Sequence, residues 1–196
     1  MKLGAVVLAA GFSRRMRKEK VLLPFGESSA LERVLSTLRQ SGIEERIVVL
    51  RADLPEAIAR AGRLGARVVV NPHPEEEMLV SIRLGLAELS SDRDAFFIWP
   101  ADHPAVSVET VVRLAREAGA RRVVLPVYRG RRGHPALIGS ELLPEIARIA
   151  ANQGLRQLWR ARPEVLQEVT VEDPGVLLDL DTPEDYERAL KQLPTS

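Results

Sequence analysis

The sequence contains no cysteine, so the 196-residue chain can form neither a disulfide nor a metal site with thiolate ligands. It also lacks an apolar run approaching the roughly 20 residues that span a bilayer, and its N-terminus has no secretory signal pattern. Neither sign of charge is in large excess, because the net charge is +1. This balance argues against DNA or an anionic membrane as a partner. We therefore expect a cytoplasmic protein that binds neither nucleic acid nor membrane.

Two familiar phosphate-binding loops are missing as well. The Walker A pattern Gly-x-x-x-x-Gly-Lys-Ser/Thr does not occur anywhere in the chain. The dinucleotide fingerprint Gly-x-Gly-x-x-Gly is absent after the first apolar run, where Gly11 stands alone. A nucleotide site in this protein would need a different loop geometry.

What the sequence does contain is an alternation of strand-like and helix-like segments. Apolar residues spaced three and four apart predict helices over Ala30–Gln40 and Met78–Leu89, and Ser107 can cap another. Asp53 is expected to cap a helix that contains Pro55 and runs to about Leu64. Continuous apolar runs predict five strands, which we expect to pair in parallel because helices separate them: Gly4–Ala9, Arg46–Leu50, Arg67–Val70, Ala95–Trp99 and Arg122–Val127. The fold class is therefore α/β, a three-layer α/β/α sandwich with a mostly parallel, Rossmann-like sheet.

The regular alternation of strands and helices ends after the fifth strand. A turn rich in glycine and arginine, residues 129–133, precedes an extended segment at 134–138 that could return as a hairpin. Val165–Thr170 is expected to be an edge strand. Thr182 and Pro183 are expected to open a last helix. No linker divides the chain, so we expect a single domain over residues 1–196.

The segment Leu8–Lys20 follows the first strand and has an unusual composition. It contains Gly11, Ser13 and five cationic side chains. Glycine allows backbone to approach a ligand, free N–H groups can cradle phosphate oxygens, and arginine or lysine can neutralise them. The segment begins at the carboxyl end of a strand, where ligands bind in sheets of this kind. The alternative is a solvated basic loop.

Carboxylates follow two other apolar segments. Asp102 comes after the fourth strand, between Pro100 and Pro104, and could hold Mg²⁺. Asp179 and Asp181 precede the last helix, and one of them could face the same edge. The alternatives are a turn-forming aspartate and acids that favour a helix N-terminus. His103 is expected to be a packed or solvated loop residue and not a metal ligand.

The order of these residues resembles the signature of the MobA-like nucleotidyltransferases, Leu-Ala-Ala-Gly-x-Ser-x-Arg-Met-Gly-x-x-Lys. An Asp-x-Pro element and a late Asp-x-Asp-Thr-Pro-Glu-Asp element match at Asp102–Pro104 and Asp179–Asp185. Residues 133–135 and 154–156 resemble elements of the molybdopterin cytidylyltransferase branch. The chain departs from the family pattern at three positions: Arg17, Glu77 and Asn152.

The resemblance implies a sheet of the nucleotide-diphospho-sugar transferase type, with a nucleotide half at about 1–105 and an acceptor half at about 106–196. It implies an enzyme that moves a nucleoside monophosphate from a triphosphate to the phosphate of molybdopterin with Mg²⁺, releasing pyrophosphate. The Ala-Ala-Gly form of the loop implies CTP, with GTP possible. The implied catalytic residues are Arg15, Lys20 and Asp102, and the implied metal ligands are Asp102 and Asp181. The implied nucleotide site comprises Leu8, Ala9, Ala10, Gly11, Ser13, Arg15, Lys20, Asn71, Met78 and Ser81, and the implied acceptor site comprises His134, Arg132 and Arg156.

Two other functions stay open on the sequence. A nucleotidyltransferase of the same fold could act on a sugar phosphate or another small phosphorylated metabolite, because the substrate half of such folds varies. A partner protein that binds a nucleotide without turnover is the alternative from a different class. The three departures keep that alternative open, and Glu77 in particular would place negative charge near an anionic ligand.

Overall fold

The computed structural model describes residues 1–12, 18–150 and 152–192. Within these residues, eight strands form one sheet in the order β10-β7-β9-β6-β1-β4-β5, with β8 paired to β7. The strands are β1 (Leu3–Leu8), β4 (Glu45–Leu50), β5 (Arg67–Val70), β6 (Ala95–Pro100), β7 (Val123–Tyr128), β8 (Arg131–Arg132), β9 (Ala136–Gly139) and β10 (Leu166–Thr170). β2 (Pro24–Phe25) and β3 (Ser28–Ser29) form a separate small hairpin.

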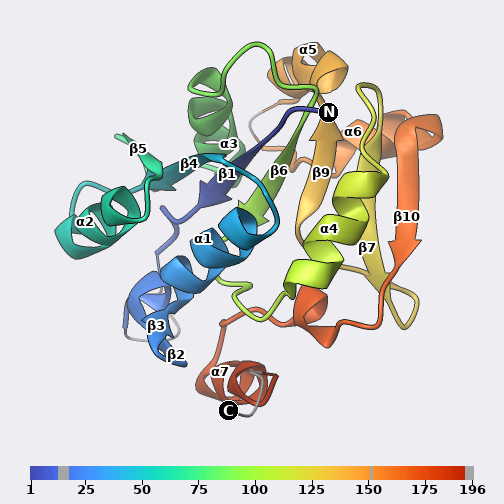
Figure 1. Ribbon diagram of the computed structural model, residues 1–196. Coiled ribbons are helices and arrows are strands. Elements are labelled where there is room, and N and C mark those ends of the chain that lie inside the picture. The colour runs from blue at the N-terminus through green and yellow to red at the C-terminus, as the bar shows by residue number, and fades with distance from the viewer. Residues whose placement is uncertain (13–17, 151, 193–196) are drawn as a thin grey trace.

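Helices cover both faces of the sheet. Figure 1 shows α1 (Ala30–Gln40) and α4 (Val108–Arg116) in front of it and α3 (Met78–Ala87) behind it. The remaining helices are α2 (Pro55–Arg63), α5 (Leu143–Arg148), α6 (Gln157–Ala161) and α7 (Pro183–Leu190), with short 3₁₀ turns η1 (Lys20–Leu22), η2 (Ser140–Leu142), η3 (Pro163–Val165) and η4 (Pro174–Leu177). The predicted α/β/α sandwich is confirmed. No helix among the described residues is long and apolar enough to cross a membrane.

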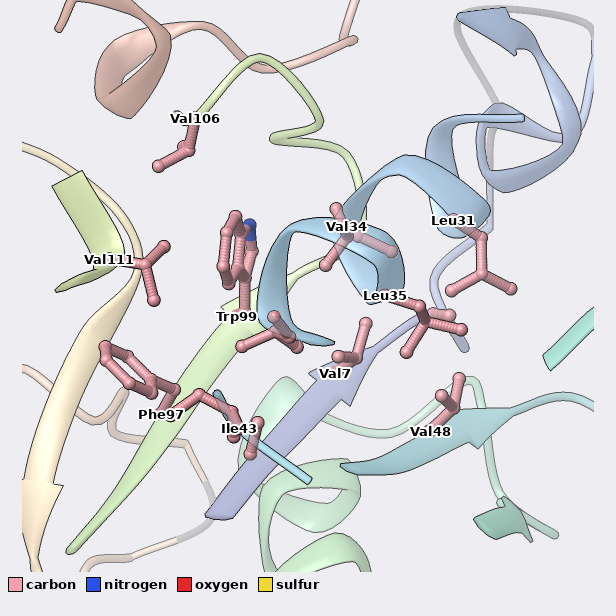
Figure 2. Packing of buried hydrophobic residues seen from close by; sticks show 14 of the residues in the cluster. Val7, Leu31, Val34, Leu35, Ile43, Val48, Phe97, Trp99, Val106 and Val111 are labelled. Atoms are coloured by element: carbon pink, nitrogen blue, oxygen red, sulfur yellow. The ribbon is translucent and has the colours of Figure 1, made fainter. Parts of the chain in front are cut away.

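Alternation along the strands divides the core in two. Ala5 and Val7 of β1 face a cluster built with α1, α2 and α4, whereas Val6 and Leu8 face a cluster built with α3, α5 and α6. Figure 2 shows the first cluster, where Val34 of α1 lies near Trp99 and Leu35 lies near Val7. Burial of side chains on both faces explains why these strands read as continuous apolar runs.

Four of the five predicted strands pair in parallel, as expected: β1 pairs with β4 and β6, and β4 pairs with β5. The fifth, β7, pairs in parallel only with the later strand β10, and no parallel neighbour in the described part of the sheet joins it to the other four. Its neighbour toward the centre is the antiparallel strand β9, which confirms the hairpin expected at residues 134–138. The chain reverses after β7 through Arg129 and Gly130, both at positive φ, and β9 inserts between β6 and β7. β10 is the expected edge strand and pairs in parallel with β7.

The predicted cap by Asp53 was also wrong. The residue before α2 is Leu54, which makes no side-chain cap. The carboxylate of Asp53 instead accepts hydrogen bonds from the guanidinium of Arg51, at 2.9 Å from Nε. A buried cation competes better for a carboxylate than a backbone N–H does. The caps predicted at Ser107 and Thr182 are present.

Candidate functional site

The carboxyl ends of β1, β4 and β6 meet at one edge of the sheet. The amide of Ala9 donates to the carbonyl of Val49 at 2.9 Å, and the amide of Ala101 donates to the carbonyl of Leu8 at 2.9 Å. These bonds extend the sheet by one residue past each strand. The glycine segment and the Asp102 segment are therefore held side by side.

A small cavity of about 230 Å³ lies at this edge. Eight of the predicted site residues line it: Leu8, Ala9, Ala10, Gly11, Lys20, Met78, Ser81 and Asp102. Residues that the sequence did not assign to the site complete the wall: Phe12, Val21, Pro74, Glu76 and Pro100. Ser13 and Arg15 lie outside the described residues, as does the departure at Arg17.

Gly11 leaves open space at the rim of the small cavity. A Cβ built on Gly11 would meet no protein atom within 4 Å among the described residues. Close packing by the protein therefore does not explain the glycine. The open space is consistent with approach of a ligand to the backbone, the reason for which a glycine is used in such loops.

Lys20, Asp102 and Asp181 converge beside this cavity. The ammonium of Lys20 forms an ion pair with Oδ1 of Asp181, and its Nζ lies 3.8 Å from Oδ2 of Asp102. Lys20 and Asp181 are 161 residues apart in the chain. Of the two late aspartates, Asp181 is thus the one that reaches this cation together with Asp102.

The carboxylate of Asp102 is only partly compensated by its surroundings. Its Oδ1 is buried and has no hydrogen-bond partner among the described residues. Burial raises the pKa of Asp102 above its ordinary value, Lys20 opposes the increase, and the charge of Asp181 adds to it. Excess negative charge with an unpaired oxygen fits the oxygen ligands that Mg²⁺ takes from one or two carboxylates, the rest coming from phosphates and water. No cluster of three or more potential His, Cys, Asp or Glu ligands occurs in the described part of the chain.

Asn71 lies behind the cavity wall and is hydrogen-bonded to Ser81 of α3. The side-chain amide of Asn71 donates to Oγ of Ser81 at 2.9 Å and accepts from the amide of His73 at 2.8 Å. Both hydrogen bonds hold the segment between β5 and α3. Asn71 is 3% exposed, whereas Met78 is 58% exposed at the start of α3. Ser81 and Met78 reach the small cavity, and Asn71 holds Ser81.

A large cavity of about 880 Å³ adjoins the small one, and Leu8, Met78 and Pro100 line both. The three residues predicted to bind the acceptor, Arg132, His134 and Arg156, are in its wall. Arg132 is paired with Glu168 at 2.5 Å. The rest of the lining is mostly apolar and includes Ile82, Ile98, Leu125, Leu155 and Trp159. The cavity can thus enclose a molecule with both an apolar and an anionic part.

The ring of His134 packs against that of His103, a residue that the sequence did not assign to the site. Their ring centroids are 4.7 Å apart and the planes are tilted by 51°. Burial lowers the pKa of His103 to about 4, and burial together with the charge of His103 lowers the pKa of His134 to about 3. Both rings are therefore neutral near pH 7. The contact spans 31 positions of the chain, so local sequence carries no signal for it.

Two departures from the family pattern lie near the large cavity. Glu77 is the residue before α3, is exposed and lines the large cavity, not the small one. Asn152 is exposed in the turn before α6. Glu77 is therefore not part of the wall of the small cavity, which contains the glycine segment.

Comparison with known proteins identifies a family. A family model described as "MobA-like NTP transferase domain" matches residues 5–167. Nicotine blue oxidoreductase of Paenarthrobacter nicotinovorans is 30% identical over 194 residues, covering 94% of this chain and 95% of its own. Molybdenum cofactor cytidylyltransferase of Escherichia coli (strain K12) is 24% identical over 187 residues and covers 92% of both chains.

Solved structures share the whole architecture. Rv0371c from Mycobacterium tuberculosis H37Rv superposes with a TM-score of 0.85 at 29% identity, covering 97% of this chain and 98% of that one. A structure of the same protein in complex with manganese superposes with a TM-score of 0.80 at 28% identity, covering 97% and 99%. The sheet is of the nucleotide-diphospho-sugar transferase type that the sequence resemblance implied.

Proposed function

The chain belongs to the MobA-like NTP transferase family and is a nucleotidyltransferase, and from this premise we propose that it transfers a cytidylyl group from CTP to the phosphate of molybdopterin. The reaction releases pyrophosphate and uses Mg²⁺. The observation that carries the proposal is the meeting of Lys20, Asp102 and Asp181 beside the small cavity. That cavity is walled by the glycine segment, which supports a cation site and a phosphate site at the same edge of the sheet.

The bond changes in this reaction are simple. An oxygen of the acceptor phosphate attacks the α-phosphorus of the triphosphate, and the bond from that phosphorus to the bridging oxygen breaks. Pyrophosphate leaves with the electron pair of that bond. The protein contributes alignment and neutralisation of charge, which are the main sources of rate enhancement in phosphoryl-group chemistry.

Each group at the edge has a task in this scheme. The backbone at Ala10 and Gly11 approaches the phosphates, and Lys20 supplies a point charge for them. Asp102 and Asp181 would hold Mg²⁺, with Asp102 oriented by the segment that follows β6. When bound, Mg²⁺ neutralises phosphate oxygens and stabilises the charge that develops on the leaving group. Arg15, outside the described residues, is proposed as a second phosphate contact.

The acceptor is proposed to occupy the large cavity. Arg156 and His134 both line this cavity, and the charge of Arg156 adds to the burial that lowers the pKa of His134. Arg132 lies in the same wall. Leu8 and Pro100 line both cavities, which supports a pose in which the acceptor phosphate points from the large cavity toward Asp102 in the small one. An acceptor with a flat ring system, polar groups on that ring and a terminal phosphate is compatible with a wall that has both apolar and polar side chains.

A second candidate function rests on the 30% identical relative, whose name describes an oxidoreductase acting on nicotine blue. In that case the large cavity, with Trp159 and aliphatic side chains in its wall, would bind an aromatic substrate for reduction. The two candidates differ in what the small cavity binds. The transferase requires a triphosphate there, and the reductase requires an electron donor.

Pyrophosphate release tests the proposal. The protein is mixed with Mg²⁺, one of the four nucleoside triphosphates, and either molybdopterin or a control sugar phosphate. We expect release with CTP and molybdopterin only. Release of pyrophosphate with a sugar phosphate would show that the acceptor is a sugar phosphate and not molybdopterin. No release with any pair, together with reduction of nicotine blue by a reduced nicotinamide, would establish the second candidate.

A further inference from the structure

Arg51 is a buried arginine at the carboxyl edge of β4, and its side chain is 3% exposed. Its guanidinium donates from Nη1 to the carbonyl of Gly11 at 2.8 Å and from Nη2 to Oε1 of Glu19 at 2.7 Å. Its Nε donates to Oδ1 of Asp53 at 2.9 Å. The guanidinium also lies 4.6 Å from the ring centroid of Phe12, within the range of a cation–π contact.

These contacts join the two ends of one segment. Gly11 and Glu19 lie at the beginning and near the end of the segment Leu8–Lys20, and Arg51 bridges them across 40 and 32 residues. Phe12 and Lys20, which are adjacent to the two ends, line the small cavity. A shift of either end would therefore move a wall of the cavity, and the end at Glu19 would move the ammonium that meets Asp102 and Asp181.

The chemistry of the side chain matches this task. A guanidinium presents five N–H donors in a rigid plane, so it can hold a carbonyl and two carboxylates at fixed angles. Two carboxylates also compensate the cost of burying its charge. An ammonium at position 51 would be a single point charge without the fixed fork. Arginine at this place is thus suited to fixing geometry in addition to balancing charge.

We infer that Arg51 is a positioning residue, which holds both ends of the glycine segment against β4 and so sets the triphosphate-binding geometry without touching the substrate. The inference rests on the proposed function of the small cavity. It assigns a role in triphosphate recognition to a residue that belongs to neither the phosphate loop nor the metal-binding pair.

The test compares Arg51→Gln with Arg46→Gln. Arg46 is a buried arginine at the amino end of β4, whereas Arg51 follows its carboxyl end, and Arg46 donates hydrogen bonds to the carbonyls of Ile43 and Leu64. We expect Arg51→Gln to raise the KM for the Mg²⁺–triphosphate by about 10-fold or more, because small misplacements of binding groups are costly. The KM for the acceptor should stay near that of the parent. Arg46→Gln should leave both KM values unchanged while lowering the melting temperature.

Two further variants complete the design. Arg51→Lys keeps the charge and should fail to restore the triphosphate KM, because it lacks the fork. Glu19→Gln changes a partly exposed partner and provides the test if Arg51→Gln does not fold. Glu19→Gln should also raise the KM for the triphosphate, by a smaller factor than Arg51→Gln does. A triphosphate KM unchanged in both Arg51→Gln and Glu19→Gln, or raised equally in Arg46→Gln, would overturn the inference.

A measurement on the protein without ligand separates this inference from the proposed function. Amide hydrogen exchange at Phe12 and Lys20, followed by NMR, should be faster in Arg51→Gln than in the parent and unchanged in Arg46→Gln. If the parent releases no pyrophosphate with any substrate pair, the proposed function fails while this result still stands. If the parent is active and exchange at Phe12 and Lys20 is unaffected in Arg51→Gln, the positioning role fails alone.

Discussion

At the scale of single residues, Asp102 is a partly buried carboxylate that lies near two other charged groups of the site. It lies near Lys20, and the charge of Asp181 helps to raise its pKa. One of its oxygens is buried and has no hydrogen-bond partner among the described residues. A protein rarely leaves a buried carboxylate oxygen unpaired unless another ligand uses it. The burial of Asp102 therefore has a cost that binding of a cation would offset.

The variant Asp102→Asn should lose nearly all turnover while keeping its fold. Removal of one electrostatic element of this kind costs roughly 10²–10³ in rate. Pyrophosphate release measures turnover, and circular dichroism checks the fold. Asp92→Asn is the matched control, because Asp92 pairs with Lys2 on an exposed surface. Near-normal turnover of Asp102→Asn would remove this residue from the mechanism.

His134 should make the stability of the protein depend on pH. Its pKa is lowered to about 3 by burial first and then by His103 and Arg156, while the carboxylate of Asp102 opposes the decrease. The ordinary pKa of histidine is about 6.5. Between about pH 6.5 and pH 3, the histidine at position 134 therefore binds a proton in the unfolded chain but not in the folded chain. The free energy of unfolding should therefore fall as the pH falls below 6.5, by up to ~1.4 kcal/mol per pH unit from this group.

Urea unfolding at pH 7, 6 and 5 checks this expectation. The parent should lose more stability over this range than His134→Gln does. The comparison isolates His134, because His103 and Asp102 titrate in both proteins. His73→Gln, which removes an exposed histidine, is the control. Parallel pH curves for the parent and His134→Gln would contradict the assignment.

At the scale of elements, the close approach of α3 to the sheet places Met78 and Ser81 at the small cavity. Gly85 permits this approach, because a Cβ there would lie 2.3 Å from Cγ1 of Val6 and 3.0 Å from Cγ2 of Val49. Contacts that short force the helix or the strands to shift. The packing of one helix thus determines where the wall of the site lies.

Gly85→Ala should destabilise the protein by about 1–3 kcal/mol, the usual cost of overpacking a core. Gly62→Ala in α2 is the matched control. A Cβ at Gly62 meets nothing within 4 Å among the described residues, and alanine in a helix interior is favoured by about 0.5–1 kcal/mol over glycine. Chemical denaturation of both variants provides the measurement. Equal changes in the two variants would show that the proximity of α3 to β1 and β4 does not matter.

At the scale of the whole molecule, ligands that bind the folded state should stabilise it by mass action. CTP at 100 times its Kd with Mg²⁺ should contribute about 2.7 kcal/mol. For a chain of this size, that corresponds to a rise in Tm of roughly 5–10 °C. Removal of Mg²⁺ with a chelator should abolish most of the rise, and Asp102→Asn should make Tm insensitive to Mg²⁺. A larger rise in Tm with GTP than with CTP would show that the protein prefers guanine to cytosine.

Much of the architecture follows from short-range patterns. The helix predicted over Ala30–Gln40 has those bounds because its apolar stripe and the capping box of Ser29 and Glu32 are local. The helix after Thr182 forms for the same reason. Pairing partners are not local, and so the insertion of β9 beside β6 was only partly foreseen. Asp53 failed as a cap because its partner, Arg51, belongs to a network that closes only in the folded chain.

The sequence by itself determined the α/β alternation, the glycine segment after the first strand, and the carboxylates after the fourth strand and before the last helix. Backbone propensity, apolar periodicity and residue type are written along the chain and need no folded context. Only the tertiary structure decided that the ammonium of Lys20 lies near the carboxylates of both Asp102 and Asp181. It also decided that His103 packs against His134 and that Arg51 donates hydrogen bonds to both Gly11 and Glu19. Such contacts join residues far apart in the chain, and their distances depend on how strands and helices pack on one another.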